Sequence, residues 1–363
     1  MHLIYYILYH FLSCLKNHKK FTEQEFPYLC IKKYFDCKDV DKKGFLQVFK
    51  EVNHLCKYWH CFPDTYFVFT HYLKEYKDIK MLETFVPQPA YWRFCKGGAE
   101  STSYSILIND KIIFHDLMTQ YGIPVPKMLF VLKNNHFFVN NHIVSNDDIN
   151  NILKRCKEDK IFVKLPCAGA AKGVFILKRR NNEFCLSNEI IKAEQLKTKF
   201  INKNVFFEER LEQEPILKAF NPDTVNTIRI LTKNINGKAE IISAAARFGR
   251  KGQYVDNMHA GGLGVSINIE TGKLEAYGGR RFDRNHYFEH PDSHLKFEGV
   301  NVPYWTKIKE IVLNTINVLP PYKSLGFDIV TSNNGPLILE INTGAGMDLA
   351  QIGKIKGIAE KLK

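Results

Sequence analysis

Residues 326–342 read GFDIVTSNNGPLILEIN, in which two apolar, strand-like runs flank a polar turn. Because side chains alternate along a strand, we expect Ile338, Glu340 and Asn342 to share one face of the second run. The opposite face is expected to pack into the core of the protein. That core face would consist of Leu337, Leu339 and Ile341.

The turn decides which residues of the two runs lie opposite each other. A three-residue loop over residues 333–335, with Gly335 in a left-handed conformation, places Asp328 opposite Glu340. A two-residue turn of Asn334 and Gly335 would instead turn Asp328 toward the apolar face and bury its carboxylate there. We therefore expect the longer loop.

The opposed carboxylates of this hairpin need a partner. Two like charges that face each other across a sheet repel, and a bound divalent cation would reverse that penalty. Asp328, Glu340 and the amide carbonyl of Asn342 are hard oxygen donors of the kind that Mg²⁺ accepts beside nucleotide phosphates. The sequence therefore predicts a magnesium site at these three residues. An ordinary hairpin with solvated polar residues is the alternative.

Composition narrows the class of protein. The chain has 363 residues, of which 45% are hydrophobic, enough for two or more globular domains with a sizeable core. Its formal net charge is +13, but the basic residues are scattered rather than gathered in blocks. We therefore expect no nucleic-acid partner, whereas an anionic substrate such as ATP is compatible with the charge.

Cysteine usage and the N-terminus bear on cellular location. The 9 cysteines form no Cys-x-x-Cys pair, so we expect reduced thiols in a cytoplasmic protein rather than a zinc site or disulfides. Residues 1–12 are largely apolar but lack the basic start and the cleavage site of a signal peptide. A packed helix is expected there. The alternative is an interfacial helix at the inner face of a membrane, helped by Lys16, Lys19 and Lys20.

The chain divides into three parts by its pattern. Residues 1–104 read as mostly helical, with apolar spacing typical of a helix over residues 45–58. Residues 105–204 read as α/β, and residues 205–363 as an antiparallel-rich α+β part. A capped helix is expected over residues 109–118. Strands are expected at 127–132, 161–165, 174–177, 205–207, 225–232, 239–247 and 264–269, with a further helix at 147–157.

A loop of small residues follows the predicted strand that ends near Lys164. Such residues let backbone N–H groups approach phosphate oxygens, and lysines beside the loop would neutralise phosphate charge. No helix follows, so this is not a Walker A loop, and a plain hairpin is the alternative. The loop contains Cys167, Ala168, Gly169, Ala170, Lys172 and Gly173.

An apolar strand at residues 205–207 runs into the acidic segment Glu208, Glu209, Arg210, Leu211. Backbone groups of such a hinge can bind the edge of an adenine, and a carboxylate after it can accept a ribose hydroxyl. A solvated acidic loop is the alternative.

Two arginines, Arg229 and Arg247, lie inside otherwise apolar strands and need partners. They would bind a carboxylate or phosphoryl group in a bidentate manner, or form ion pairs with nearby glutamates. The polar loop that follows could close over a substrate, through Asp256, Asn257, Gly261 and Gly262.

Taken in order, these segments resemble the ATP-grasp superfamily over residues 105–351, and within it the sugar-transfer associated group. The resemblance implies an ATP-grasp fold, in which two α+β subdomains clasp ATP, with a mostly helical N-terminal extension. Lys111 and Lys164 would contact phosphates, the loop from Cys167 to Gly173 would be a lid, and Glu208 to Leu211 would bind adenine. A ribose carboxylate would be Glu214 or Glu212. Two Mg²⁺ ions would bind at Asp328, Glu340 and Asn342.

The resemblance also implies a reaction. Arg229 and Arg247 would steady a transferred phosphoryl group and an acyl-phosphate, which an amine then attacks to form an amide. A sugar acid, or a lipid-linked glycan, and an amino acid are the implied partners, in the biosynthesis of a surface polysaccharide such as a capsule. A small-molecule phosphotransferase, and a non-catalytic nucleotide-binding scaffold, are the alternatives.

Overall fold

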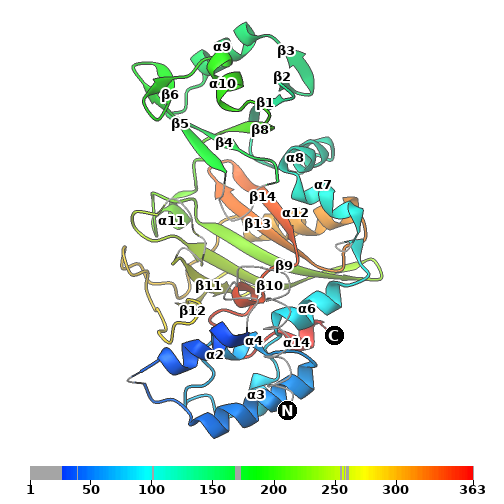
Figure 1. The fold of residues 1–363 in the computed structure, drawn as a ribbon, viewed down its shortest axis with the longest axis vertical. Coiled ribbons are helices and arrows are strands. Elements are labelled where there is room, and N and C mark those ends of the chain that lie inside the picture. Colours follow the sequence, from blue (N-terminus) through cyan, green and yellow to red (C-terminus); the bar gives the residue numbers. More distant parts are fainter. Residues whose placement is uncertain are drawn as a thin grey trace.

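The computed structural model describes residues 27–38, 40–99, 102–167, 173–253, 256, 258 and 261–362. Along its long axis, a helical N-terminal region, a six-stranded sheet and an eight-stranded sheet follow one another (Figure 1). The helix expected within the first 20 residues lies outside the described part of the chain. Within that part, no helix is both long enough and apolar enough to cross a bilayer.

The N-terminal region is helical, as the sequence predicts. In its longest helix, Val48, Val52 and Leu55 are buried, as the helical spacing of apolar residues requires. The helices are α2 Pro27–Asp36, α3 Phe45–Trp59, α4 Asp64–Val68, α5 Ile79–Leu82 and α6 Gln88–Cys95.

The eight-stranded sheet has the order β3-β2-β1-β8-β4-β5-β6-β7, and helices α9 Asn146–Arg155 and α10 Ala193–Lys199 pack on it. In β4, Ile161 and Val163 are fully buried in its core. Phe162 and Lys164 therefore lie on the opposite face. The strands are β1 Met128–Lys133, β2 His136–Val139, β3 His142–Val144, β4 Lys160–Lys164, β5 Val174–Arg180, β6 Glu183–Leu186, β7 Glu189–Ile190 and β8 Val205–Glu209.

Strand β8 lies just after residue 204, the predicted boundary between the second and third domains. It pairs with both β1 and β4, so it belongs to the eight-stranded sheet. The division itself stays a prediction.

The six-stranded sheet has the order β12-β11-β10-β9-β13-β14. Helix α12 Trp305–Val318 packs on one face, where Ile308 and Val312 meet Ile228 and Ile230. Because side chains alternate, Arg229 lies on the other face. The strands are β9 Thr227–Ile235, β10 Lys238–Phe248, β11 Leu263–Ile267, β12 Leu274–Gly279, β13 Leu325–Ser332 and β14 Gly335–Thr343.

The N-terminal region covers part of that other face. Tyr91 and Cys95 of α6 form an apolar cluster with Leu231 of β9 and Met347. The region therefore lies on the arginine-bearing side of the sheet. The remaining helices are α7 Ile106–Asn109, α8 Lys111–Gln120, α11 Pro215–Lys218, α13 Met347–Ala350 and α14 Ala359–Leu362.

The hairpin of β13 and β14 confirms that Asp328 lies opposite Glu340, but the expected loop is wrong. Ser332 pairs with Gly335, which leaves a two-residue turn of Asn333 and Asn334. A bulge between Asp328 and the next residue restores the register by adding one residue to β14.

The bulge also changes which side chains of β14 enter the core. Ile338 and Ile341 are both buried, whereas Leu337 and Leu339 are only half-buried. The expected core face of alternate residues is therefore wrong at Leu337 and Leu339. The extra residue at the bulge shifts the alternation of side chains by one position. Ile338 therefore lies on the same face of the strand as Ile341.

Candidate functional site

Asp328 lies between the two strand arginines. The Arg229 Nη2 group donates to Asp328 Oδ2 at 3.0 Å, and its Nε donates to Oδ1. Arg247 Nη2 reaches Asp328 Oδ2 at 3.1 Å from the next strand. Asp328 and Arg229 are direct partners across β13 and β9, so the sheet register creates the cluster.

The charges of this cluster stabilise one another. Burial raises the pKa of Asp328, but the opposing effect of Arg229 and Arg247 is larger. The pKa of Asp328 therefore lies well below its ordinary value. Burial lowers the pKa of Arg247, but Asp256 and Asp328 outweigh it, so its net pKa lies above the ordinary value. Asp328 and Arg247 are therefore charged at neutral pH.

Asp256 anchors Arg247 from the second side. Its Oδ2 lies 3.3 Å from Arg247 Nε, and it also accepts from the Thr227 backbone N–H at 2.9 Å and from the Thr227 hydroxyl. Arg247 Nε donates to Thr227 Oγ1 at 2.8 Å. The buried Asp256 thus fixes the position of the guanidinium group.

The structure describes only part of the rest of the loop that is predicted to contact substrate. The carbonyl of Gly261 accepts a hydrogen bond from Arg280 at 2.6 Å, and Gly262 is buried. Asn257 lies outside the described residues. A substrate contact by this loop stays a prediction.

Lys111, the first residue of α8, joins the two sheets. Its backbone N–H donates to the carbonyl of Pro166, beside the small-residue loop, at 3.1 Å. Its Nζ lies 3.5 Å from Glu340 Oε2 on β14. The Asp110 side chain caps the helix by accepting from Ile112 N at 2.9 Å, which fixes the start of α8. Lys111, predicted to contact phosphate, therefore lies beside Glu340, predicted to bind metal.

The predicted metal residues fit a divalent cation in their donor chemistry. Asn342 Nδ2 donates to Glu340 Oε1 at 3.3 Å, so the amide and carboxylate heads are adjacent, and the Glu340 side chain is 34% exposed. Asp328 lies opposite Glu340, but its carboxylate already forms ion pairs with Arg229 and Arg247. Among the described residues, no three of His, Cys, Asp and Glu gather to hold a metal alone. The metal assignment stays a prediction.

Lys164 ends β4 on the face away from its core, where it forms an ion pair with Glu208 of β8. After it, Leu165 N donates to Gly173 O at 3.2 Å and closes the small-residue loop. Cys167 is exposed, and burial and Asp110 raise its pKa. Its Sγ lies 3.6 Å from Asp110 Oδ2. The predicted lid residues Ala168, Gly169 and Ala170 lie outside the described part of the chain.

The hinge borders a cavity of about 650 Å³. Phe162 and Ile176 supply apolar surface from the eight-stranded sheet, and Leu211 supplies it from the hinge. Lys160 and Lys178 add positive charge. The cavity therefore combines apolar side chains with cations, which suits a nucleotide.

The other hinge side chains have local partners. Glu209 pairs with Lys127 at 2.8 Å, and Arg210 with Asp159 at 3.2 Å. Glu214 accepts from Ile216 N at 3.0 Å as the N-cap of α11. The role of this segment in binding adenine stays a prediction.

Glu212, in contrast, lines the cavity, 3.6 Å from Lys218. It is therefore better placed than Glu214 to meet a ligand there.

Sequence reasoning missed several residues of the site. Thr227 anchors both Arg247 and Asp256, yet a threonine in a strand has no distinguishing signal. Phe162 could have been predicted, because it lies on the same predicted strand as Lys164, whereas Lys160 precedes that strand by one residue.

Residues 96–363 match the sequence profile of the family described as sugar-transfer associated ATP-grasp. No curated protein matches the chain. Similar solved structures include a D-alanine–D-alanine ligase from Coxiella burnetii, with 13% identity and a TM-score of 0.37, over 67% of this chain and 50% of that one. Another is a biotin carboxylase complex from Campylobacter jejuni, with 11% identity and a TM-score of 0.43, over 71% and 46%.

A third is a phosphoribosylamine–glycine ligase from Thermotoga maritima, with 14% identity and a TM-score of 0.41, over 68% and 51%. The chain spans about half the length of these proteins. The family profile covers most of the chain, including both sheets and the site described above. The chain therefore belongs to the sugar-transfer associated ATP-grasp family.

Proposed function

We propose that this protein is an ATP-dependent carboxylate–amine ligase that forms ADP and works through an acyl-phosphate. The observation that carries the proposal is the cluster in which Arg229 and Arg247 share the buried Asp328. Glu340, directly opposite Asp328, links the cluster through Lys111 to the small-residue loop. Fixed cations beside accessible oxygen donors suit a reaction that transfers a phosphoryl group.

The nucleotide would bind between the sheets. Its adenine would occupy the slot between Phe162 and the hinge backbone, and its ribose would meet Glu212. Lys111 and Lys164 would neutralise the phosphates, and binding would draw them from their ion pairs with Glu340 and Glu208. Mg²⁺ held by Glu340, Asn342 and Asp328 would supply charge neutralisation between the phosphates.

The first chemical step is proposed at the arginine cluster. A carboxylate oxygen of the substrate attacks the γ-phosphorus, and the bond from that phosphorus to the bridging oxygen breaks, releasing ADP. Arg229 and Arg247 would stabilise the transferred group through their remaining N–H donors, because Asp328 and Asp256 hold both guanidinium planes in place.

The second step forms the new bond. An amine nitrogen attacks the carbonyl carbon of the acyl-phosphate, the carbon–oxygen bond to phosphate breaks, and the nitrogen loses a proton. No protein nucleophile is required. Burial and the neighbouring Asp110 raise the pKa of Cys167, the exposed thiol of the loop, and so disfavour its thiolate form.

The family description favours a carbohydrate as one substrate. We propose a sugar acid or a lipid-linked glycan as the carboxylate partner and an amino acid or another amine as the acceptor, in the assembly of a surface polysaccharide. We place the enzyme in the cytoplasm, and its first 20 residues could contact the inner face of the membrane. Liposome flotation with and without those residues tests that contact, and equal flotation would dismiss it.

A screen of sugar acids against amines tests the reaction, with ADP release and product mass as readouts. The ligase predicts ADP and phosphate only when both substrates are present, with a product heavier by the amine less one water. A stable phosphorylated product without an amine would show the phosphotransferase instead. If no pair of substrates leads to ADP release although ATP binds, the non-catalytic scaffold is favoured.

A further inference from the structure

The segment that follows β14, residues 344–348, is held by helix α6 of the N-terminal region. The Gln88 side chain donates from Nε2 to the Ala345 carbonyl at 3.1 Å and accepts from the Met347 N–H through Oε1 at 2.8 Å. One side-chain amide thus satisfies two backbone groups of the segment, as a neighbouring strand would. The start of α6 is fixed in turn, because the Gln88 N–H donates to Asp64 Oδ1 at 3.0 Å.

A second glutamine makes the reverse contact. The Gln351 side chain accepts from the Val86 N–H at 2.8 Å and donates to the Val86 carbonyl at 3.1 Å, so its amide pairs with both backbone groups of one residue. Gln351 is fully buried. Two side-chain amides, one from each side, therefore join the N-terminal region to the chain that follows β14.

The segment 344–348 lies on the arginine-bearing face of the six-stranded sheet. Gly326 pairs with Asn342 across β13 and β14, so these two residues share that face. A Cβ on Gly326 would lie 2.6 Å from Ala345 Cβ and 3.5 Å from Arg229 Cδ. Ala345 therefore fills the space above Gly326, beside the stem of Arg229 and on the face that carries Asn342.

Helix α6 also covers the turn that leads from β14 into the segment. Gly344 has φ +67°, and a Cβ there would lie 3.4 Å from the indole nitrogen of Trp92. Ala345 and Met347 are buried in one apolar cluster with Tyr91. The segment thus packs against the sheet and against α6, so its position depends on both.

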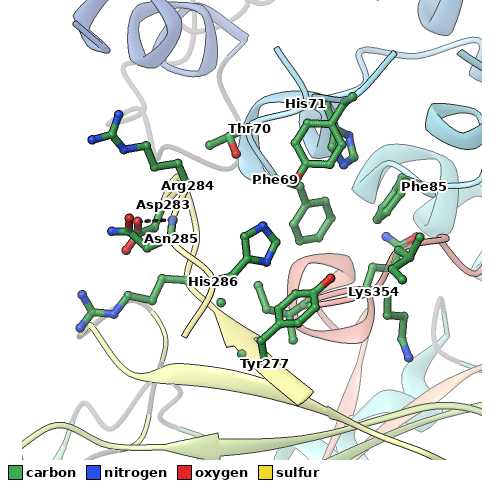
Figure 2. A pocket seen from close by; sticks show the side chains of 18 of the residues that line it. Phe69, Thr70, His71, Phe85, Tyr277, Asp283, Arg284, Asn285, His286 and Lys354 are labelled. Carbon is green, nitrogen blue, oxygen red and sulfur yellow. Dashed lines mark hydrogen bonds between the residues drawn. The ribbon is translucent and has the colours of Figure 1, made fainter. Parts of the chain in front are cut away.

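Beside β12, by contrast, the interface is open. A second cavity, of about 350 Å³, lies there between the N-terminal region, β12 and the C-terminal part of the chain (Figure 2). Figure 2 shows Phe69 and His71 on one side of this cavity and Tyr277 on the other. At this cavity, unlike at α6, the N-terminal region is not packed closely on the sheet. The lining comes from residues 69–85, 277–286 and 351–355.

We propose that Gln88 is a positioning residue for the metal site, so that the N-terminal region completes the proposed catalytic site rather than forming a separate module. The Gln88 amide holds Ala345 against Gly326, and this contact fixes the end of β14, which carries Asn342. The inference rests on the metal site of the proposed function. It goes beyond that function, because the family profile begins at residue 96, after the end of α6.

The affinity for a nucleotide with and without metal tests the proposal. The Kd of the non-hydrolysable ATP analogue AMP-PNP is measured by calorimetry on the full chain, once with Mg²⁺ and once with EDTA. The ratio of the two Kd values gives the gain in affinity due to the metal. Gln88→Ala should reduce this gain about tenfold and leave the Kd in EDTA unchanged, because residues that orient metal ligands act on metal affinity.

Two further variants separate positioning from a loss of stability. Tyr91→Phe is the matched control, because it removes a hydrogen bond of 2.8 Å from the same helix to Ser324, elsewhere on the sheet. Its gain from Mg²⁺ should equal that of the parent. Gln88→Glu keeps the acceptor for the Met347 N–H but loses the donor to the Ala345 carbonyl, so its gain should lie between those of the parent and Gln88→Ala. It carries the test if thermal unfolding shows that Gln88→Ala does not fold.

A parental gain from Mg²⁺ in the Gln88 variants, or an equal loss in Tyr91→Phe, would overturn the proposal. A parent chain that gains no affinity from Mg²⁺ would overturn it as well, because no metal site would then need positioning. The ligase reaction is measured separately by ADP release. Absence of that release with a normal gain from Mg²⁺ would leave the role of Gln88 standing and the ligase reaction wrong.

Discussion

At the scale of single residues, Asp328 holds the site together electrostatically. It is 2% exposed and binds the guanidinium groups of Arg229 and Arg247. A buried carboxylate of this kind is tolerated only because it is paired, and removing either side leaves an uncompensated charge. The same contact orients both arginines toward the edge of the sheet that carries Glu340.

The stability of the fold should depend on the charge of Asp328. Its pKa in the folded chain lies below the ordinary value of 3.8, so the stabilisation is fully present above that pH. It is lost as the pH falls through the folded pKa, because the unfolded chain binds the proton first. Urea unfolding across the acid range should show this loss, and Asp328→Asn should be less stable near neutral pH with a shallower acid decline. An unchanged acid decline in that variant would contradict the pairing.

Asp256 should act as a positioning residue for Arg247. Asp256→Asn removes one charge from the guanidinium and should lower kcat about 10- to 100-fold, since small misplacements of a catalytic group cost that much. ATP binding should be little changed. Asp292→Asn, which breaks the ion pair of Arg250 elsewhere on the surface, is the control. Equal kcat values in the two variants would show that Asp256 does not position the arginine.

At the scale of elements, the small-residue loop depends on one close approach. Gly173 has φ +72°, and a Cβ on it would lie 2.5 Å from Leu165 Cδ1. Its carbonyl accepts from Leu165 N, so the two residues close the base of the loop. A side chain there would displace the Leu165 side chain at the base of the loop, where the phosphates are proposed to bind.

Gly173→Ala should therefore raise the KM for ATP about tenfold, because the contact between residues 165 and 173 that closes the base of the loop is disturbed. Gly237→Ala is the matched control, because Gly237 has φ +79° but a Cβ added there would meet no atom within 4 Å. Both variants should lose about 1 kcal/mol of stability from the strained backbone. A KM change that is the same in both would place its cause in backbone strain rather than in the loop.

The elements also show what the sequence could predict. Alternation and turn residues predicted most strands, the capped helix α8 and the opposition of Asp328 and Glu340. The bulge at Leu339 was not predictable, because no residue type marks it and it changes the register by a single position. The contact of Arg229 with Asp328 joins strands far apart in sequence, which local periodicity does not encode.

At the scale of the whole molecule, Lys111 links the two sheets. Lys111 touches both the loop after β4 and the end of β14, and the hinge at Glu209 to Leu211 follows β8. Fold and family followed from motifs in order along the chain, and the family profile confirms them. The second cavity could not be predicted, because its lining combines three segments that carry no motif of their own.

Ligand binding across the sheets should stabilise the whole fold. ATP with Mg²⁺ at a hundredfold excess over Kd should add about 2.7 kcal/mol and raise the thermal midpoint. Glu340→Gln should abolish the Mg²⁺-dependent part of that rise and leave the part due to ATP alone. Glu289→Gln, which alters an exposed surface glutamate, is the control. A full Mg²⁺-dependent rise in Glu340→Gln would remove this residue from the metal site.

The most direct test of the proposed chemistry follows the carboxylate oxygen. The sugar acid that drives ADP release would be labelled with ¹⁸O in its carboxylate and turned over with ATP and the amine. The account predicts one ¹⁸O atom in each released phosphate, because the carboxylate oxygen that attacks the γ-phosphorus leaves with it. Released phosphate without the label would contradict an acyl-phosphate and with it the proposed ligase.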